Sequence, residues 1–416
     1  MDRIVITGLG AVTPIGNDVN TFWKNIVAGV SGASPYIQEE YPDYPVHINC
    51  DVKDFDPLLY MSRKQARQTS RPTHLSIAAA KQAVLDANIK IQSSDNGISP
   101  ERVGVVMNTG GGGITEAEEG TRVYLDRGPR SVSPFMIPKG MPNAVSAGVA
   151  MEIGAKGLAL TSTVACASGN YALVQGAHFL MRREADLIIA GGAESVISPV
   201  YMAGLHRMKA LSRWEGDPAG ASRPFDADRT GFVFGEGAAA LILEREESAV
   251  RRGAHIYAEV VGGRMTADAF HITAPDPEGY GAARAMIGAL ESAGVLTEDV
   301  EVIYAHGTST PLGDVAETKA LKIVFGDHAS KLLVTATKST IGHTMGAAGA
   351  ISSVAAVCGI RDSLVPPTIN LHTPDPLCDL DYVPLVARSH PHSLAMVNAF
   401  GFGGHNVCVV IGKYEG

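Results

Sequence analysis

One polar signature occurs twice in this chain of 416 residues. The first copy, residues 161–169, reads TSTVACASG, and the second, residues 337–346, reads TKSTIGHTMG. When the shared Ser-Thr pairs are aligned, Cys166 of the first copy takes the place of His343 in the second. Each copy follows an apolar run and precedes a segment with helical spacing, so both residues are predicted to open a helix. The repeat predicts one active site built from two related halves.

Three further pairs of segments match in the same order along the chain. They are residues 1–10 with 255–263, residues 102–110 with 299–307, and residues 185–192 with 394–404. When the polar residues that end their apolar runs are aligned, the second of these pairs places Asn108 opposite His306. The matches predict a duplicated fold whose halves span residues 1–254 and 255–416.

Composition fits a large α/β core. Apolar residues make up 45% of the chain and charged residues 19%, and the 46 glycines suit many tight turns between strands and helices. No linker or low-complexity segment divides the sequence, so we expect two closely packed halves. No apolar run approaches the roughly 18 residues that a membrane span needs, and the N-terminus lacks a signal sequence. We therefore expect a soluble, cytoplasmic protein without a membrane partner.

Charge and cysteine usage narrow the function further. The net charge of -9 argues against nucleic acid as a partner, because phosphate binding needs a concentrated basic face. The five cysteines are widely spaced and lack a Cys-x-x-Cys pair, so reduced thiols without a metal site are expected. Lys64, Arg67 and Lys209 lie in short basic stretches. Each stretch alone fits a solvated helix surface, but together they can form a rim that binds an anionic partner.

Cys166 has the surroundings of a nucleophile. A cysteine in the first turn of a helix feels the positive end of the helix dipole, which favours the thiolate and lowers the thiol pKa. The small residues around it allow a substrate carbonyl to approach, and they leave backbone N–H groups free to polarise that carbonyl. An inert buried cysteine is the commoner case, and we expect it for Cys50, Cys358, Cys378 and Cys408.

Two histidines and a lysine follow apolar strands in the second half. His306 ends a strand and His343 lies in a glycine-flanked turn, so both imidazoles can converge on one thiolate. Either histidine alone fits a structural role equally well, and the duplication favours catalysis. Lys338 would need an acidic partner if it were buried. We predict that it pairs with Glu317, near Asp314, and that this pair positions the histidines; a surface lysine is the alternative.

Glycine-rich segments offer a candidate lid and two weak phosphate-loop patterns. Residues 400–406 read FGFGGHN, which fits either a mobile aromatic lid carried by Phe402 or an ordinary turn with phenylalanines in the core. Residues 8–16 and 110–113 look like phosphate-binding loops, but neither has the spacing of a nucleotide-binding motif. Nucleotide binding is therefore not expected.

As a set, the motifs of this chain resemble those of the β-ketoacyl-acyl carrier protein synthases, of the elongating type II class in the thiolase superfamily. The resemblance runs from end to end. It rests on VITGLG at 5–10, ACAS at 165–168, SRPFD at 222–226, GFVFGEG at 231–237, DAFHIT at 268–273, HGTSTP at 306–311, KSTIGH at 338–343, PPTIN at 366–370 and NAFGFGG at 398–404.

The resemblance implies a duplicated five-layer αβαβα fold, a homodimer and a triad of Cys166, His306 and His343. An acyl chain would move from the phosphopantetheine of an acyl carrier protein to Cys166, with its oxygen held by the backbone N–H groups of Cys166 and Phe402. Malonyl carrier would then lose CO2, and its carbanion would attack the acyl-enzyme. The resemblance also assigns Phe402 as a gate and Thr308 and Thr310 as pantetheine contacts, and it implies no metal or redox cofactor.

The same resemblance gives the basic stretches a partner, because acyl carrier proteins are acidic. Lys64, Arg67 and Lys209 are the expected docking residues. The chain departs from the family pattern at His405, which stands where many members have threonine, and this leaves the motion of the gate open.

Related enzymes remain as alternatives. A degradative thiolase would carry a second cysteine in residues 401–406, and none is present. A type III synthase would have asparagine where this chain has His343. A non-condensing carrier-binding or decarboxylating protein is disfavoured by Cys166. A polyketide ketosynthase subunit has the same triad and stays open, as does the preferred acyl chain length.

Overall fold

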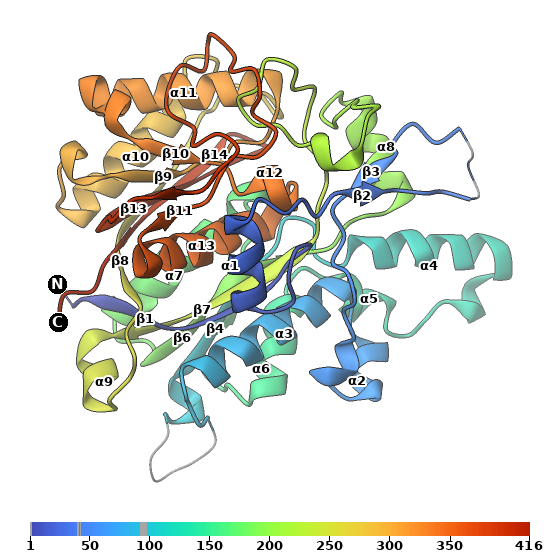
Figure 1. The fold of residues 1–416 in the computed structure, drawn as a ribbon. Coiled ribbons are helices and arrows are strands. Elements are labelled where there is room, and N and C mark those ends of the chain that lie inside the picture. The colour runs from blue at the N-terminus through green and yellow to red at the C-terminus, as the bar shows by residue number, and fades with distance from the viewer. Residues whose placement is uncertain (1, 40, 42, 92–97) are drawn as a thin grey trace.

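The computed structural model describes residues 2–39, 41, 43–91 and 98–416, and in this part of the chain ten strands form one mixed sheet (Figure 1). Their order is β10-β9-β13-β14-β8-β1-β7-β6-β4-β5. The strands of the first half are β1 (Ile4–Val12), β4 (Val103–Asn108), β5 (Ala159–Leu160), β6 (Leu187–Glu194) and β7 (Gly237–Arg245). Those of the second half are β8 (Ala258–Ala267), β9 (Val302–Tyr304), β10 (Leu333–Thr335), β13 (Leu394–Gly401) and β14 (His405–Gly412). Two small ladders pair β2 (Ser34–Pro35) with β3 (Ile48–Asn49) and β11 (Leu364–Val365) with β12 (Arg388–Ser389).

The two halves of the sheet have the same topology. In the first half β4 runs parallel to β5 and β6, and β7 runs antiparallel to β6 and β1. In the second half β9 runs parallel to β10 and β13, and β14 runs antiparallel to β13 and β8. The strands β6 and β13 are each eight residues long, and their register beside β4 and β9 makes His306 equivalent to Asn108. The predicted duplication and this matched pair are confirmed.

Helices complete five layers, as expected for an αβαβα fold. The helices α7 (Ser168–Met181) and α13 (Ala348–Asp362) pack together between the two halves of the sheet. On the outer face of the first half lie α3 (Arg71–Asp86) and α6 (Ala144–Ile153), and α10 (Tyr280–Ala293) and α11 (Pro311–Phe325) cover the second (Figure 1). The remaining helices are α1 (Val19–Val27), α2 (Arg63–Gln68), α4 (Ile114–Arg127), α5 (Met136–Gly140), α8 (Pro199–Arg207), α9 (Glu246–Arg251) and α12 (Lys338–Ile341). None of the helices in the described ranges is long and apolar enough to cross a bilayer.

The two central helices touch at their first turns, where only glycine fits. A Cβ atom on Gly169 would lie 2.5 Å from the backbone nitrogen of Ala350, and one on Gly349 would lie 2.7 Å from the backbone nitrogen of Asn170. These distances are too short for any side chain. The reciprocal contacts relate α7 and α13 by approximate two-fold symmetry and bring the starts of both helices to the middle of the molecule.

This symmetry corrects the predicted alignment of Cys166 with His343. Ala165 and Met345 both have left-handed backbone, with φ of 51° and 43°. Each opens a 3-10 turn, residues 165–167 and 345–347, that leads directly into α7 or α13. Cys166 is therefore equivalent to Gly346. His343 lies between α12 and the second turn, so the prediction that both residues open a helix holds for Cys166 alone.

Candidate active site

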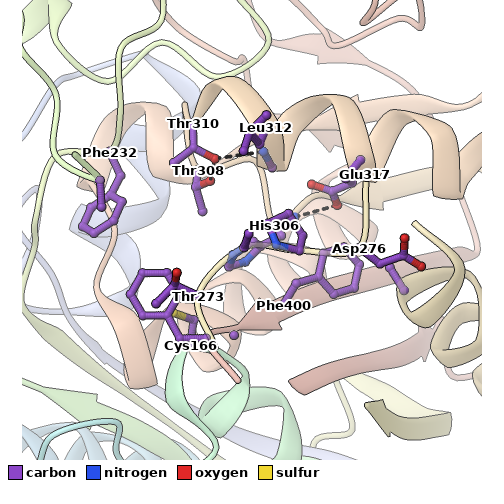
Figure 2. A pocket seen from close by; sticks show the side chains of 18 of the residues that line it. Cys166, Phe232, Thr273, Asp276, His306, Thr308, Thr310, Leu312, Glu317 and Phe400 are labelled. Atoms are coloured by element: carbon purple, nitrogen blue, oxygen red, sulfur yellow. Dashed lines mark hydrogen bonds between the residues drawn. The ribbon is translucent and has the colours of Figure 1, made fainter. Parts of the chain in front are cut away.

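A cavity of about 390 Å³ opens between the two halves, and Figure 2 shows it from close by. Its lining includes eight of the residues predicted from the sequence to act in or near the site: Cys166, His306, His343, Thr308, Thr310, Glu317, Phe402 and Lys209. The cysteine comes from the turn before α7, and the histidines come from the loops after β9 and α12. The fold thus brings together segments that lie far apart in the chain.

Cys166 is buried beside His343. Its Sγ lies 3.1 Å from Nε2 of His343 and 3.8 Å from Sδ of Met345. Burial raises the pKa of the thiol to about 12, while the positive charge of Lys338 and the backbone N–H groups of Phe402 and Cys166 act in the opposite direction. The expectation of a lowered pKa is wrong, because the apolar cluster around the sulfur outweighs the helix start.

His343 is held on both sides of its ring. Its Nδ1 accepts the backbone N–H of Met345 at 3.3 Å, so in the neutral ring the proton is on Nε2 and faces the sulfur of Cys166. Phe232 packs edge-on against the ring with centroids 5.1 Å apart. Burial and the nearby charge of Lys338 hold the pKa of His343 well below its ordinary value.

His306 stands against His343 at nearly a right angle. The ring centroids are 5.4 Å apart with an interplanar angle of 85°, and the ring of Phe400 lies 5.6 Å from that of His306. Burial, followed by the charge of Lys338, lowers the pKa of His306 well below its ordinary value. Both imidazoles are therefore neutral near pH 7, and each carries one N–H that can donate to a substrate oxygen.

Lys338 begins α12 and is almost completely buried. Burial lowers its pKa to about 8, and the negative charges of Glu317 and Asp314 oppose that shift. Among the described residues no salt bridge joins Lys338 to Glu317, so the predicted direct pair is not formed. The oxygens of Glu317 instead accept the backbone N–H groups of His306 at 2.9 Å and Gly307 at 2.8 Å. Glu317 thus fixes the backbone that carries His306, and it affects Lys338 only through its charge.

Asp314 shapes the wall of the cavity. It lies 3.4 Å from the guanidinium of Arg229 and accepts the backbone N–H of Thr308 at 3.1 Å. Burial raises its pKa to about 7, against the charge of Arg229. The hydroxyl oxygens of Thr308 and Thr310 are 3.0 Å apart, and that of Thr310 caps α11. In Figure 2 both threonines lie across the cavity from Cys166.

Phe402 lies in the hairpin between β13 and β14, and both strands contact the turn at residues 165–167 that carries Cys166. A Cβ atom on Gly401 would lie 3.0 Å from the backbone nitrogen of Cys166, which explains the glycine before the aromatic ring. Gly403 and Gly404 follow with φ of 82° and 73°, and Gly403 donates its N–H to Ile272 at 2.8 Å. The loop is therefore a turn in which the left-handed backbone of Gly403 and Gly404 determines where their N–H groups point.

Comparison with known proteins agrees with this geometry. The family model described as "Beta-ketoacyl synthase, N-terminal domain" matches residues 1–249, and "Beta-ketoacyl synthase, C-terminal domain" matches residues 257–372. The chain belongs to the beta-ketoacyl synthase family. The resemblance inferred from the motifs is thereby confirmed.

Individual members of the beta-ketoacyl synthase family are similar over nearly their whole length. A 3-oxoacyl-[acyl-carrier-protein] synthase 2 of Synechocystis sp. is 45% identical, over 99% of this chain and 98% of that protein. The protein of the same name from Staphylococcus aureus is 44% identical, over 99% of both. Among solved structures, the ishigamide ketosynthase/chain length factor superposes with a TM-score of 0.92 at 33% identity over 100% of both chains. A beta-ketoacyl synthase from Burkholderia phymatum gives 0.91 at 32% identity, also over 100% of both chains.

The basic residues of this beta-ketoacyl synthase are only partly brought to the cavity. Lys209 is exposed at the end of α8 and lines the cavity. Lys64 and Arg67 are exposed on α2 and do not belong to the lining. The structure therefore places one predicted docking residue at the cavity and the other two on a separate helix.

Several residues of the site were not found from the sequence. Met345 touches the sulfur, Phe232 packs on His343, and Arg229 faces Asp314. Met345 could not be found from the sequence, because its left-handed backbone and its N–H bond to His343 leave no recognisable motif. His405, where the chain departs from the family pattern, begins β14, and its Nδ1 is buried without a hydrogen-bond partner among the described residues.

Proposed function

We propose that this beta-ketoacyl synthase is a 3-oxoacyl-[acyl-carrier-protein] synthase of fatty acid elongation. It catalyses the decarboxylative Claisen condensation of an acyl-enzyme thioester with malonyl-acyl carrier protein and releases CO2. The observation that carries the proposal is the 3.1 Å contact between Cys166 Sγ and His343 Nε2, with the His306 ring packed against His343 at the same cavity.

In the first step Cys166 attacks the acyl thioester carried on phosphopantetheine. A new bond forms between Sγ and the carbonyl carbon, the bond to the pantetheine sulfur breaks, and the proton of Cys166 leaves with the pantetheine thiol. The Nε2 proton of His343 stabilises the thiolate during attack. The backbone N–H groups of Cys166 and Phe402 then hold the carbonyl oxygen of the tetrahedral intermediate.

In the second step the two histidines act on malonyl carrier. The neutral rings of His306 and His343 donate N–H bonds to the thioester oxygen, where charge develops as the bond to CO2 breaks. The electron pair passes into the enolate, whose carbon attacks the acyl group on Cys166. A carbon–carbon bond forms and the sulfur leaves as a thiolate.

Lys338 supports both steps through its charge. Together with burial, which has the larger effect, it lowers the pKa of both imidazoles and keeps them neutral, and it favours the thiolate of Cys166. Glu317 and Asp314 keep Lys338 charged in its buried position, because their negative charges raise its pKa. Thr308 and Thr310 contact the pantetheine arm, and Phe402 acts as the gate. This chemistry needs no metal or redox cofactor.

The partners follow from the same proposal. Acyl carrier protein docks on Lys64, Arg67 and Lys209, whose positive charges suit an acidic partner. The protein works as a homodimer in the cytoplasm. The dimer uses the open edge at β5, where the exposed Met151 lies on α6, the helix that packs against β5. The two halves meet between residues 254 and 255, in the segment that joins α9 to β8.

The test is intact-protein mass spectrometry of the carrier after incubation with acyl carrier and malonyl carrier. The expected product is a carrier whose acyl chain is longer by one ketide unit, and this product disappears with Cys166→Ala. The Cys166→Ala variant keeps slow release of CO2 from malonyl carrier, because decarboxylation uses the histidines. If the wild-type protein yields only acetyl carrier, the protein is a decarboxylating relative and the proposal is wrong.

One observation favours a second candidate, a polyketide ketosynthase. A solved structure of a type II polyketide acyl-carrier protein in complex with its ketosynthase bound to the hexaketide superposes with a TM-score of 0.90 at 33% identity. The same mass spectra separate the two functions. A fatty acid synthase makes one extension for each round of reduction, whereas a polyketide enzyme adds successive units without it.

A further inference from the structure

The carboxylate of Glu194 is fully buried at the end of β6, and the proposed reaction does not use it. It accepts the backbone N–H groups of Gly110 at 2.8 Å, Gly346 at 3.1 Å and Gly111 at 3.2 Å, and the hydroxyl of Thr109 at 3.1 Å. No salt bridge reaches it among the described residues. A buried carboxylate without a cation is costly, and donors from two distant segments surround this one.

Symmetry shows what the carboxylate replaces. Gly346 is the equivalent of Cys166, and each contributes a backbone N–H at the start of a central helix. The N–H of Cys166 is directed at the sulfur, whereas the N–H of Gly346 is directed at Glu194. At the position in the second half that is equivalent to Cys166, the carboxylate of Glu194 therefore occupies the space in front of the backbone N–H. A Cβ atom on Gly110 would lie 2.7 Å from that carboxylate, so glycine is required there.

The segment that Glu194 holds reaches directly into the active site. Gly346 follows Met345, whose φ of 43° is unfavourable for a residue with a side chain. The N–H of Met345 donates to Nδ1 of His343, and its Sδ lies 3.8 Å from Cys166. A change at Gly346 would therefore alter which nitrogen of His343 carries the proton.

We propose that Glu194 is a positioning residue of the condensing site. By accepting the N–H of Gly346 it holds Met345 in its left-handed conformation, which keeps the Met345 N–H on Nδ1 of His343 and the Nε2 proton facing Cys166. The inference rests on the proposed function, because it gives Glu194 a part in the same site.

Only the ionised form of Glu194 can accept all these bonds. Burial raises its pKa, and the N–H groups of Gly346, Gly110 and Gly111 and the hydroxyl of Thr109 oppose that shift. The titratable groups that face it are the Cys166 thiol from the turn before α7 and the Tyr201 phenol from α8, whose own pKa values are raised by burial and by the charge of Glu194. A thiol and a phenol are neutral or anionic, so neither of them provides a cation for the carboxylate.

The first test is Glu194→Gln, with Glu244→Gln as the matched control. Glu244 is equally buried in the neighbouring strand β7 but bonds to Thr7 and Arg252, away from the site. In protein labelled with ¹⁵N-histidine, the signal of His343, identified by its loss in His343→Asn, is expected to report Nε2–H in the wild type and in Glu244→Gln. In Glu194→Gln we expect a population with Nδ1–H. We also expect kcat to fall about 100-fold while KM for malonyl carrier changes little.

An unchanged tautomer with kcat close to the wild-type value would overturn the inference. The tautomer is read without turnover, so a wild type that makes no 3-oxoacyl carrier would refute the proposed function and leave this measurement intact. The two failures are therefore distinguishable.

A milder variant covers the case in which Glu194→Gln does not fold. Thr109→Val removes one donor and raises the pKa of Glu194 further, so the acidic limb of the kcat–pH profile should move to higher pH. Thr121→Val, on the exposed side of α4, is the control and should leave the profile in place. A Thr109→Val profile that superimposes on the wild type would contradict the proposal.

Discussion

Lys338 is the residue whose charge reaches every reactive group of the site. Burial has the larger effect on each group, and the charge of Lys338 adds to the lowering of the pKa of His306 and His343 and opposes the raising of the pKa of Cys166. The pKa of Lys338 itself, about 8, shows how strongly burial opposes the charged form. No direct salt bridge neutralises it among the described residues, so its field is not cancelled at short range. A cation in this position therefore acts on the pKa of three side chains at once, in addition to the larger effect of burial.

Replacing Lys338 by methionine should change the pH dependence as well as the rate. Without the cation the pKa of both imidazoles rises, so they become protonated at a higher pH and the acidic limb of CO2 release moves upward. The pKa of Cys166 also rises, and kcat should fall roughly 100-fold. CO2 release from malonyl carrier, measured across the pH range, checks this. Lys322→Met, which removes an exposed lysine paired with Asp379, is the control; identical profiles for the two variants would refute the role.

At this scale the sequence identified side chains that meet in the cavity but not their protonation. Cys166, His306 and His343 could be found because polar residues that end apolar runs gather at one edge of a sheet. The raised pKa of Cys166 could not be predicted, because the apolar residues that bury the thiol come from separate segments of the chain. They include Val196, Phe232 and Met345. The pairing of Lys338 with Glu317 failed for a related reason, since backbone N–H groups occupy the carboxylate.

Among the elements, β6 is anchored at its start by charge. Asp186, directly before β6, bonds to Arg102 and to Arg245 at the end of β7. These guanidinium groups lower the pKa of Asp186 to about 2. A lowered pKa means that the stabilisation is present above the ordinary pKa of 3.8 and is lost as the pH falls from there towards 2.

Asp186→Asn should therefore destabilise the protein at pH 7 and have little effect near pH 2. Because about a third of the side chain is exposed, we expect the loss at pH 7 to be only about 1 kcal/mol. Urea unfolding at both pH values measures it. Asp379→Asn, which removes the more exposed partner of Lys322, should show a smaller difference. Equal losses for Asp186→Asn at both pH values would count against the ion pairs.

The contact between α7 and α13 gives a second prediction at the level of elements. Gly349→Ala would place a Cβ atom 2.3 Å from Asn170 Oδ1 and 2.7 Å from its backbone nitrogen, so the helices would have to separate. We expect a loss of about 1–3 kcal/mol in the free energy of unfolding, together with reduced activity. The control is Gly204→Ala in α8, where nothing lies within 4 Å and alanine should be neutral or stabilising. Equal stability of the two variants would contradict the close approach.

The helices and strands also show where alignment of the two halves by residue identity fails. The strands were paired correctly because hydrophobic runs keep their spacing, and Asn108 was rightly placed opposite His306. The Ser-Thr pairs misled the alignment of Cys166, because its true equivalent is defined by the left-handed backbone of Ala165 and Met345. Because alanine and methionine have such different side chains, their shared backbone conformation leaves no common pattern in the sequence.

For the whole molecule, the charge distribution predicts how carrier-bound substrate is recognised. Charge reversal at Lys64, Arg67 and Lys209 should raise KM for acyl carrier and change little for a small thioester, because the acidic groups that these residues attract belong to the carrier and are absent from the thioester. Steady-state kinetics with both substrates measures the difference, and Lys24→Glu on the exposed side of α1 is the control. An equal rise in KM for both substrates would mean that the variants damage the site itself.

The place of β1 in the sheet has a consequence for how the protein is made. β1 is translated before every other described strand of the sheet, yet it lies between β7, which ends at Arg245, and β8, which ends at Ala267. Until β7 has been translated, β1 therefore has both edges unpaired, although all nine of its residues are buried in the folded protein. Such an edge is a template for aggregation. The backbone groups of Ile4–Val12 therefore stay open to pairing with another chain until the strands that flank β1 have been translated.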